Sequence, residues 1–308
     1  IHHRAALSIL YSQVHMDHLL LNDNWGNPIY ALHSSISLRN SHLHSEITGD
    51  LINVKYGDCL IDSCIFIGND RVDTDAIDLD GVMDGEVKNS EIQYFFGSNS
   101  DGIDLGEESK NILIENCFIN EITDKGISIG QFSSATLLNN TITYCNLGLG
   151  IKDKGVGIIN HNTFYSNVYA ASVYEKNPGA GGGQVEVYNS IISNSSKSPM
   201  NFDRFSIGLS EQNIYDTDTL LGNNNIWGNP LFSNPNHYHF QLLPGSAAIN
   251  AGLDGENLGA PYTPLTKDPK ILISDLLYFH PYNPDKEFLR IANPGESTVD
   301  ISNYALSG

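Results

Sequence analysis

Short apolar runs that alternate with polar residues recur along the chain at nearly constant spacing. One set of runs places Asn or Ser beside a second small residue, and it reads ISLRNSHL (36–43), LIDSCIFI (60–67), EVKNSEIQ (86–93), LIENCFIN (113–120), LLNNTITY (137–144), INHNTFYS (159–166) and VEVYNSII (185–192). A second set follows the first, at 51–55, 76–80, 102–106, 126–130, 148–152 and 171–175. This period-two alternation predicts β-strands with one face buried.

The repeat predicts a parallel β-solenoid. Its period is 22–27 residues, with two or three short strands per repeat and no helical pattern between them. Each turn would pair with the next, so equivalent residues stack ~4.8 Å apart. Aligning the first set puts one amide or hydroxyl in each turn, and we expect these side chains to hydrogen-bond from turn to turn; they are Asn40, Ser63, Asn89, Asn116, Asn140, Asn162 and Asn189.

The organisation of the chain resembles known families in three places. Residues 1–225 resemble the right-handed parallel β-helix proteins, which include pectate lyases and polygalacturonases; the fold class implied is all-β. Residues 226–261 resemble the tail of secreted bacterial β-helix proteins, and we expect them to close the last coil and cover an open sheet edge. Residues 262–270 read as a linker. Residues 271–308 resemble the start of a lamin-tail domain, an incomplete β-sandwich module, on the strength of Glu287–Leu289 and Asn293–Gly295.

The charge balance narrows the range of partners. The chain has 36 Asp and Glu against 16 Lys and Arg, a formal charge of −20. Such a surface repels nucleic acid and anionic lipid, and the longest apolar runs are too short for a membrane span. We therefore expect no nucleic-acid partner and no membrane insertion. With the resemblances, the sequence predicts a secreted or cell-surface protein, a monomeric module of a larger multidomain chain.

Carboxylates gather on consecutive turns of the predicted solenoid. Asp75, Asp78, Asp101 and Asp104 form a two-by-two cluster, with Asp80 and Asp124 at its margin. Like charges ~5 Å apart repel, and raised pKa values, a nearby cation or a bound metal ion can relieve the repulsion. An all-oxygen cluster suits Ca²⁺, so these four aspartates are the predicted metal ligands.

The same residues resemble the active site of polysaccharide lyases of family nine. Ser100–Asp101–Gly102–Ile103–Asp104 matches four of five positions of their D-D-G-[FI]-D motif. The resemblance implies a Ca²⁺-dependent lyase that cleaves an acidic, uronate-containing polysaccharide by β-elimination. The turn that would supply the lysine has Ser128 in that column, so Lys125 or Lys152 has to act instead. Asp101 joins these lysines as a candidate catalytic residue, and Asp124, Lys154 and Tyr174 are candidates for substrate contact.

Two alternatives to the lyase stay open. Polygalacturonase-type hydrolases of family twenty-eight have N-T-D, D-D, G-H-G and R-I-K on successive turns, and this chain keeps Asp75, Asp101 and Lys152 of that set. Inverting hydrolysis needs a protonated acid and a separate base, but the histidine and one aspartate are replaced here. The second alternative is a non-catalytic carbohydrate-binding or adhesin scaffold, in which the aspartates serve turn geometry or bind an ion that stiffens the coil.

Overall fold

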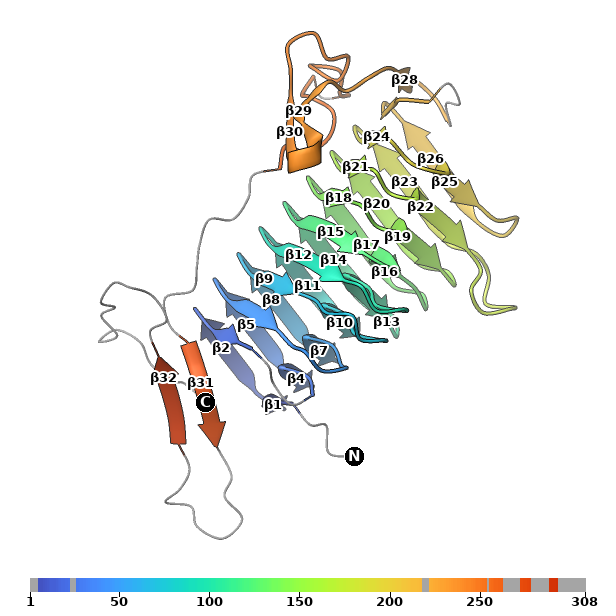
Figure 1. Cartoon of the computed structure of the whole chain (residues 1–308). Coiled ribbons are helices and arrows are strands. Elements are labelled where there is room, and N and C mark those ends of the chain that lie inside the picture. The colour runs from blue at the N-terminus through green and yellow to red at the C-terminus, as the bar shows by residue number, and fades with distance from the viewer. Residues whose placement is uncertain are drawn as a thin grey trace.

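The computed structural model describes residues 5–22, 26–217, 222–253 and 255–262, together with the backbone of two strands at 272–277 and 288–292. Figure 1 shows a solenoid whose coils follow one another from the N-terminal strands to β25 and β26. The prediction of an all-β parallel solenoid is confirmed.

Three parallel sheets run the length of the solenoid, and each turn contributes one strand to each sheet. Sheet A contains β1 (Leu7–Leu10), β4 (Ile29–Leu32), β7 (Ile52–Lys55), β10 (Ile77–Asp80), β13 (Ile103–Gly106), β16 (Lys125–Ile129), β19 (Leu147–Lys152), β22 (Tyr169–Tyr174) and β25 (Ser198–Phe202). Sheet B contains β2 (Gln13–Asp17), β5 (Ser35–Arg39), β8 (Asp58–Asp62), β11 (Met83–Lys88), β14 (Lys110–Glu115), β17 (Ser134–Leu138), β20 (Val156–Asn160), β23 (Gln184–Tyr188) and β26 (Ile207–Glu211).

Sheet C has ten strands because it continues one strand beyond the other two sheets. Its strands are β3 (Leu20–Leu21), β6 (His42–His44), β9 (Ile65–Ile67), β12 (Glu91–Phe95), β15 (Phe118–Ile122), β18 (Thr141–Thr143), β21 (Thr163–Tyr165), β24 (Ile191–Ser193), β27 (Ile214–Tyr215) and β28 (Ile226–Trp227). We number the turns 1 to 9 by their sheet A strands. The last solenoid strand therefore ends at residue 227, two residues past the boundary predicted from the repeats.

The core is a set of apolar stacks inside the three sheets. In sheet A, one stack pairs in register from turn to turn and is fully buried from turn 2 to turn 7; it contains Ile29, Ile52, Ile77, Ile103, Ile127 and Leu149. Phe66, Ile92, Ile119 and Ile142 form the equivalent stack in sheet C. The alternation predicted for the second set of runs is thus confirmed: its apolar residues point inward and its polar residues point outward.

The bend between sheets B and C contains the predicted ladder of polar side chains, with one correction of register. Asn140 and Asn162 are fully buried and belong one position later, in the column of Cys117 and Ser190, because Thr141 pairs with Phe118. Asn162 Oδ1 accepts hydrogen bonds from the Asn140 backbone and amide nitrogens, both at 2.9 Å. The residues that do stack with Asn116 are Asn139 and His161, which share its positive φ. The bend has two residues in each of these turns, and the error arose because Asn occurs at either position of it: Asn139 and Asn140 fill both in turn 6.

The segment after β28 folds back along the outside of sheet C (Figure 1). It contains the antiparallel pair β29 (Phe232–Asn234) and β30 (His239–Leu242). Tyr262 stacks on Phe118 with ring centroids 3.7 Å apart, and its hydroxyl donates to Glu91 at 2.9 Å. At the other end, Ala248 and Leu258 pack with Ile191 and Ile214. The segment therefore covers the side of turns 4 to 9 and extends well beyond the last coil that the sequence predicted it to close.

Two further strands, β31 (Leu272–Leu277) and β32 (Phe288–Ala292), pair antiparallel. The rest of the predicted lamin-tail-like module (271–308), and the predicted linker after Tyr262, lie outside the described residues. No helix among the described residues is long and apolar enough to cross a membrane.

Candidate functional site on the outer face of sheet A

The outer face of sheet A presents three columns of side chains, one residue per turn. The start column lies where the chain enters each strand and contains Asp50, Asp75, Asp101 and Lys125 in turns 3 to 6. The middle column contains Asn53, Asp78, Asp104, Ser128, Gly150 and Ser172 in turns 3 to 8. The end column contains Lys55, Asp80 and Gly106, and later Lys152 and Tyr174. The predicted two-by-two cluster of aspartates is therefore in register.

The start-column carboxylates accept backbone hydrogen bonds from the next turn. Asp50 Oδ1 accepts the backbone N–H of Asp75 at 3.1 Å, and Asp75 Oδ1 accepts that of Asp101 at 2.6 Å. Asp101 Oδ1 in turn accepts the backbone N–H of Lys125 at 3.0 Å. Each carboxylate thus satisfies a donor at the next bend, which explains an aspartate at this position without any ligand.

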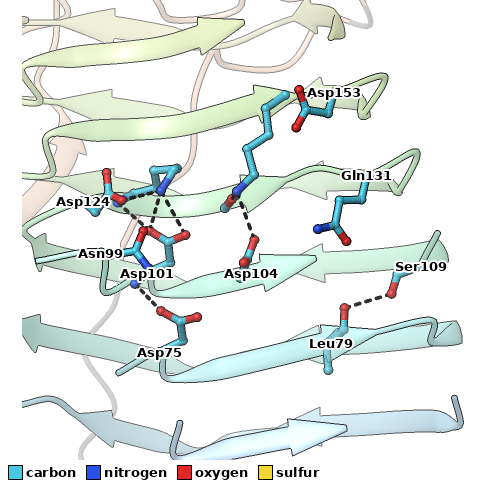
Figure 2. A network of polar contacts seen from close by, with 12 residues as sticks. Asp75, Leu79, Asn99, Asp101, Asp104, Ser109, Asp124, Gln131 and Asp153 are labelled. Atoms are coloured by element: carbon cyan, nitrogen blue, oxygen red, sulfur yellow. Dashed lines mark hydrogen bonds and ion pairs between the residues drawn. The ribbon is translucent and has the colours of Figure 1, made fainter. Parts of the chain in front are cut away.

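Lys125 ends this series and forms a buried ion pair. Its Nζ lies 3.1 Å from Asp101 Oδ1, 3.2 Å from Oδ2 and 2.5 Å from Asp124 Oδ2. The side chains of Lys125 and Asp101 are both only 5% exposed. Figure 2 shows Asp75, Asp101 and Asp124 gathered at this end of the face, with Asp104 further along the strands. Both oxygens of Asp101 therefore already face an ammonium group.

The middle-column carboxylates have fewer partners. Asp78 Oδ2 accepts from Asn53 Nδ2 at 2.5 Å. Asp104 Oδ1 lies 3.5 Å from Lys152 Nζ and accepts no hydrogen bond from the described residues. Asn53 is 7% exposed, and its buried Oδ1 also accepts none from them. Unsatisfied buried oxygens are costly, so this column has spare capacity for a cation or a donor.

Lys152 reaches back over the preceding turn. Its Nζ donates to Ser128 Oγ at 2.5 Å, and its stem lies over Gly130, where an added Cβ would stand 2.7 Å from Lys152 Cε. The stem of Lys125 likewise lies over Gly150, where a Cβ would stand 2.7 Å from Lys125 Cδ. The two glycines leave room for the lysine stems, which lie flat on the sheet and bring both ammonium groups to the edge of the carboxylates.

Sequence reasoning did not assign a role to the residues of turn 3. Asp50 and Asn53 extend the start and middle columns by one turn, and Lys55 pairs with Asp80 and lies 3.7 Å from Glu107 Oε1. Reading the same columns one turn back, in the LINVK run at 51–55, would have found all three. The carboxylates of turns 3 to 5 therefore lie between Lys55 on their N-terminal side and Lys125 and Lys152 on their C-terminal side.

Asp75, Asp78 and Asp101 bind protons more tightly than free aspartate does. Burial, then the charges of Asp101 and Asp50, raise the pKa of Asp75 well above its usual value. Burial and the charges of Asp50 and Asp80 do the same for the pKa of Asp78. Burial raises the pKa of Asp101 to about 6, although Lys125 opposes the shift. For Lys125, burial lowers the pKa, but the carboxylates of Asp101 and Asp124 outweigh burial and raise it, so this lysine is cationic at neutral pH.

The donor chemistry of this face fits a hard divalent cation. The face offers only oxygen ligands, several of them anionic, beside the unsatisfied oxygen of Asn53, and Ca²⁺ takes such ligands. Across the described residues, however, no three His, Cys, Asp or Glu side chains converge on one point.

The remaining predicted site residues border this face. Tyr174 follows Lys152 in the end column and is half-buried. Its pKa is raised, mainly by burial, with Lys125 acting in the opposite direction. Lys154 is exposed in the bend after β19, with its Nζ 5.0 Å from the centre of the Phe132 ring. Lys154 thus lies beside the sheet, away from the carboxylates.

Three parallel sheets wound from one strand per turn define the parallel β-helix class. A profile described as "Right handed beta helix region" matches residues 6–214, more than half of the chain. The chain therefore belongs to the right-handed β-helix family. Comparison with the curated proteins finds no significant match.

Solved structures show the same fold at low sequence identity. Pectate lyase Pel9A superposes with a TM-score of 0.55 and 13% identity, over 80% of this chain and 77% of that chain. The periplasmic alginate epimerase AlgG superposes with a TM-score of 0.49 and 13% identity, over 64% of this chain and 49% of that chain. The present chain thus spans about half the length of the epimerase. At this identity the similarity shows the fold, and function has to be argued from the site.

Proposed function

We propose that the protein acts on an acidic, uronate-containing polysaccharide and cleaves it by β-elimination on the outer face of sheet A. The observation that supports this most is the sequence of charges along the face: carboxylates in turns 3 to 5, then Lys125 and Lys152. The resemblance of the Asp101–Asp104 segment to the lyase motif and the fold shared with a pectate lyase point the same way.

The proposed metal ligands are the oxygens that the fold leaves least occupied. Asp78, Asp104 and Asn53 would hold Ca²⁺, with Asp50 and Asp75 beside them. Asp101, also predicted as a ligand, is already neutralised by Lys125. When bound, the ion would neutralise the uronate carboxylate and thereby acidify the neighbouring C–H group.

The two lysines take different roles in this proposal. Lys125 is held between Asp101 and Asp124, so it stays cationic and helps to attract the carboxylate of the sugar. Lys152 has a single carboxylate partner, at 3.5 Å; its amine first loses a proton to solvent and, in the neutral form, accepts the proton from the carbon next to the uronate carboxylate. The C4–O bond then breaks, a C4–C5 double bond forms, and the leaving oxygen takes up a proton. Tyr174, Asp124 and Lys154 border the path of the sugar chain.

The test is the formation of unsaturated uronate ends, followed by absorbance, on polygalacturonate and on alginate. The wild type should form product with Ca²⁺ and lose it with EDTA. Lys152→Ala should lower the rate by about 10²- to 10⁴-fold, the usual contribution of general base catalysis. Lys88→Ala, which removes a lysine from sheet B, is the matched control. Product formation at the wild-type rate by Lys152→Ala would contradict the assignment of the base.

A hydrolase remains the second candidate because of the raised pKa values of Asp75 and Asp101. A carboxyl group that stays protonated near neutral pH is what a general acid requires. The same assay separates the two reactions: hydrolysis would produce new reducing ends without unsaturated ends. If neither product forms from any uronate polymer, the non-catalytic binding or scaffold role is the one that is left.

The proposal also extends to the location and context of the protein. Polymeric uronates lie outside the cytoplasm, so we place the protein in a secreted or cell-surface setting, as a monomeric module of a larger chain that continues into the lamin-tail-like segment at 271–308. Detection of the intact chain in the medium or on washed cells, and its absence from the cytoplasmic fraction, would support this location.

A further inference from the structure

The charged residues of the solenoid are distributed unevenly along its axis. Residues 5–122 contain 20 Asp and Glu against five Lys and Arg, whereas residues 123–217 contain seven against six. The strongly acidic balance of the chain is therefore a property of the N-terminal turns, and the C-terminal turns are nearly neutral.

The cations of the C-terminal turns include four that stand free. Lys154, Lys176, Lys197 and Arg204 are exposed and belong to none of the ion pairs of the described residues. Elsewhere in residues 5–262, six cations pair with a carboxylate within 4 Å: Arg39, Lys55, Arg71, Lys88, Lys125 and Lys152. We call the four free cations the basic strip. Lys154, Lys176 and Arg204 lie in the bends that follow β19, β22 and β25, and Lys197 lies in the bend before β25, at the opposite edge of sheet A, so the four cations flank the sheet on both sides.

Acidic residues near the basic strip point into the bends. Asp153 Oδ1 accepts the backbone N–H groups of Lys176 and Asn177 at 2.8 and 2.9 Å. Glu175 Oε1 accepts those of Gly179 and Gly181 at 3.0 and 2.8 Å. Because backbone donors hold these carboxylates, the ammonium groups beside them remain available to an external anion.

Three of the four cations also lie over aromatic rings. Lys154 Nζ is 5.0 Å from the centre of the Phe132 ring, Lys197 Nζ is 5.4 Å from that of Tyr169, and Arg204 Cζ is 4.5 Å from that of Phe205. Phe132 and Phe205 are 46% and 48% exposed. A cation seated on an exposed ring offers a charge and an apolar surface together, which suits a sugar carboxylate on a pyranose ring.

We propose that the basic strip is an extended binding surface for the uronate polymer, continuing the sheet A site toward the C-terminal end of the solenoid. This inference rests on the proposed substrate class and goes beyond it by naming the direction in which the chain extends. From turn 7 to turn 9 the strip covers roughly 10 Å at the strand spacing, a length that needs more than one sugar residue. The strip would bind the polymer without a metal ion.

The experiment measures binding of the full chain to immobilised polygalacturonate and alginate in EDTA, at low and high salt. One variant combines Lys154→Gln, Lys197→Gln and Arg204→Gln. The matched control combines Arg39→Gln, Arg71→Gln and Lys88→Gln, which changes the net charge equally but leaves the strip intact. Fully methyl-esterified polygalacturonate serves as the uncharged polymer.

The strip variant should bind at least about tenfold more weakly than the wild type at low salt, and high salt should reduce the difference because screening weakens exposed charges. The control variant should bind like the wild type, and the esterified polymer should bind weakly to all three proteins. Equal binding by the strip variant and the wild type would overturn the inference. Binding is measured without turnover, so a protein that binds through the strip and cleaves nothing would disprove the lyase and still support the strip.

Discussion

The outer face of sheet A has the same backbone in turns 3 to 5 and in turns 6 to 9, but the two regions carry opposite chemistry. In the acidic turns, Asp78 and Asp104 stand in the middle column in register. In the following turns that column contains Ser128, Gly150 and Ser172; the stem of Lys125 lies over Gly150, and Lys152 donates to Ser128. In a solenoid, the outward residue can therefore differ from one turn to the next while the inward residues keep their stack. One face can thus bind a cation in some turns and an anion in others.

The boundary between the two regions is the buried pair of Asp101 and Lys125, where we expect the largest effect on stability. Lys125→Met should lower the free energy of unfolding by about 3–5 kcal/mol, because it leaves a buried carboxylate without its cation. The double variant Asp101→Asn/Lys125→Met should regain most of this loss. Denaturant unfolding measures both variants. A loss below about 1 kcal/mol for the single variant would show that the pair does not hold the two regions together.

Calcium should distinguish the acidic turns from the basic ones. At 100 times its Kd, a ligand that binds only the folded state stabilises it by about 2.7 kcal/mol, so Ca²⁺ should raise the Tm and EDTA should reverse the shift. Asp78→Asn/Asp104→Asn should abolish the shift, whereas Asp58→Asn, an exposed residue on sheet B, should preserve it. Thermal unfolding with and without Ca²⁺ gives the answer. An equal shift in the Asp78/Asp104 variant would place the ion elsewhere.

Removing one of the crowded carboxylates should stabilise the metal-free protein at neutral pH. The folded state raises the pKa of Asp78, so this group favours folding below the unfolded pKa of about 4, and that contribution is lost as the pH rises through the folded pKa. In EDTA, Asp78→Asn should therefore gain about 1 kcal/mol at pH 7, discounted for the partly exposed side chain, and nothing near pH 3. Asp58→Asn should show no gain at either pH. A gain that is independent of pH would contradict the electrostatic origin.

The smallest effects on stability are expected in the basic strip. Lys197→Gln and Arg204→Gln remove exposed cations whose aromatic contacts are worth about 0.5–1 kcal/mol at most. Their thermal unfolding should stay close to that of the wild type while polymer binding weakens. A loss of stability as large as that of Lys125→Met would mean that these residues support the fold instead of forming a binding surface.

The sequence alone was sufficient to predict the fold and much of the outer face of sheet A. The recurrence of apolar and polar positions predicted the solenoid, the inward stack from Ile52 to Leu149, and the register of Asp75 with Asp101 and Asp78 with Asp104. Strand pairing in a parallel solenoid preserves such columns from turn to turn, so aligned repeats place residues in space.

The parts that escaped prediction lie where the sequence has no alternating pattern or where the contacts come from residues far apart in the chain. Asn140 and Asn162 were misplaced by one position because Asn occurs at either position of the two-residue bend, and a bend has no alternation to fix its register. Side-chain direction was also beyond the pattern: the sequence placed Lys125 and Lys152 one and two turns beyond Asp104, but not their flat stems over Gly150 and Gly130. The packing of Tyr262 against Phe118 depends on contacts far apart in the chain and left no local signal.

The most direct test of a cation site and a polymer-binding surface on the same outer face of sheet A is a crystal structure of the Lys152→Ala variant. The crystals would contain Ca²⁺ and an oligomer of galacturonate or guluronate. The account predicts an ion at Asp78 and Asp104, one sugar carboxylate beside it near Lys125, and the oligomer running along sheet A toward Lys154 and Arg204. An oligomer bound on sheet B or sheet C, or an ion held away from these aspartates, would contradict it.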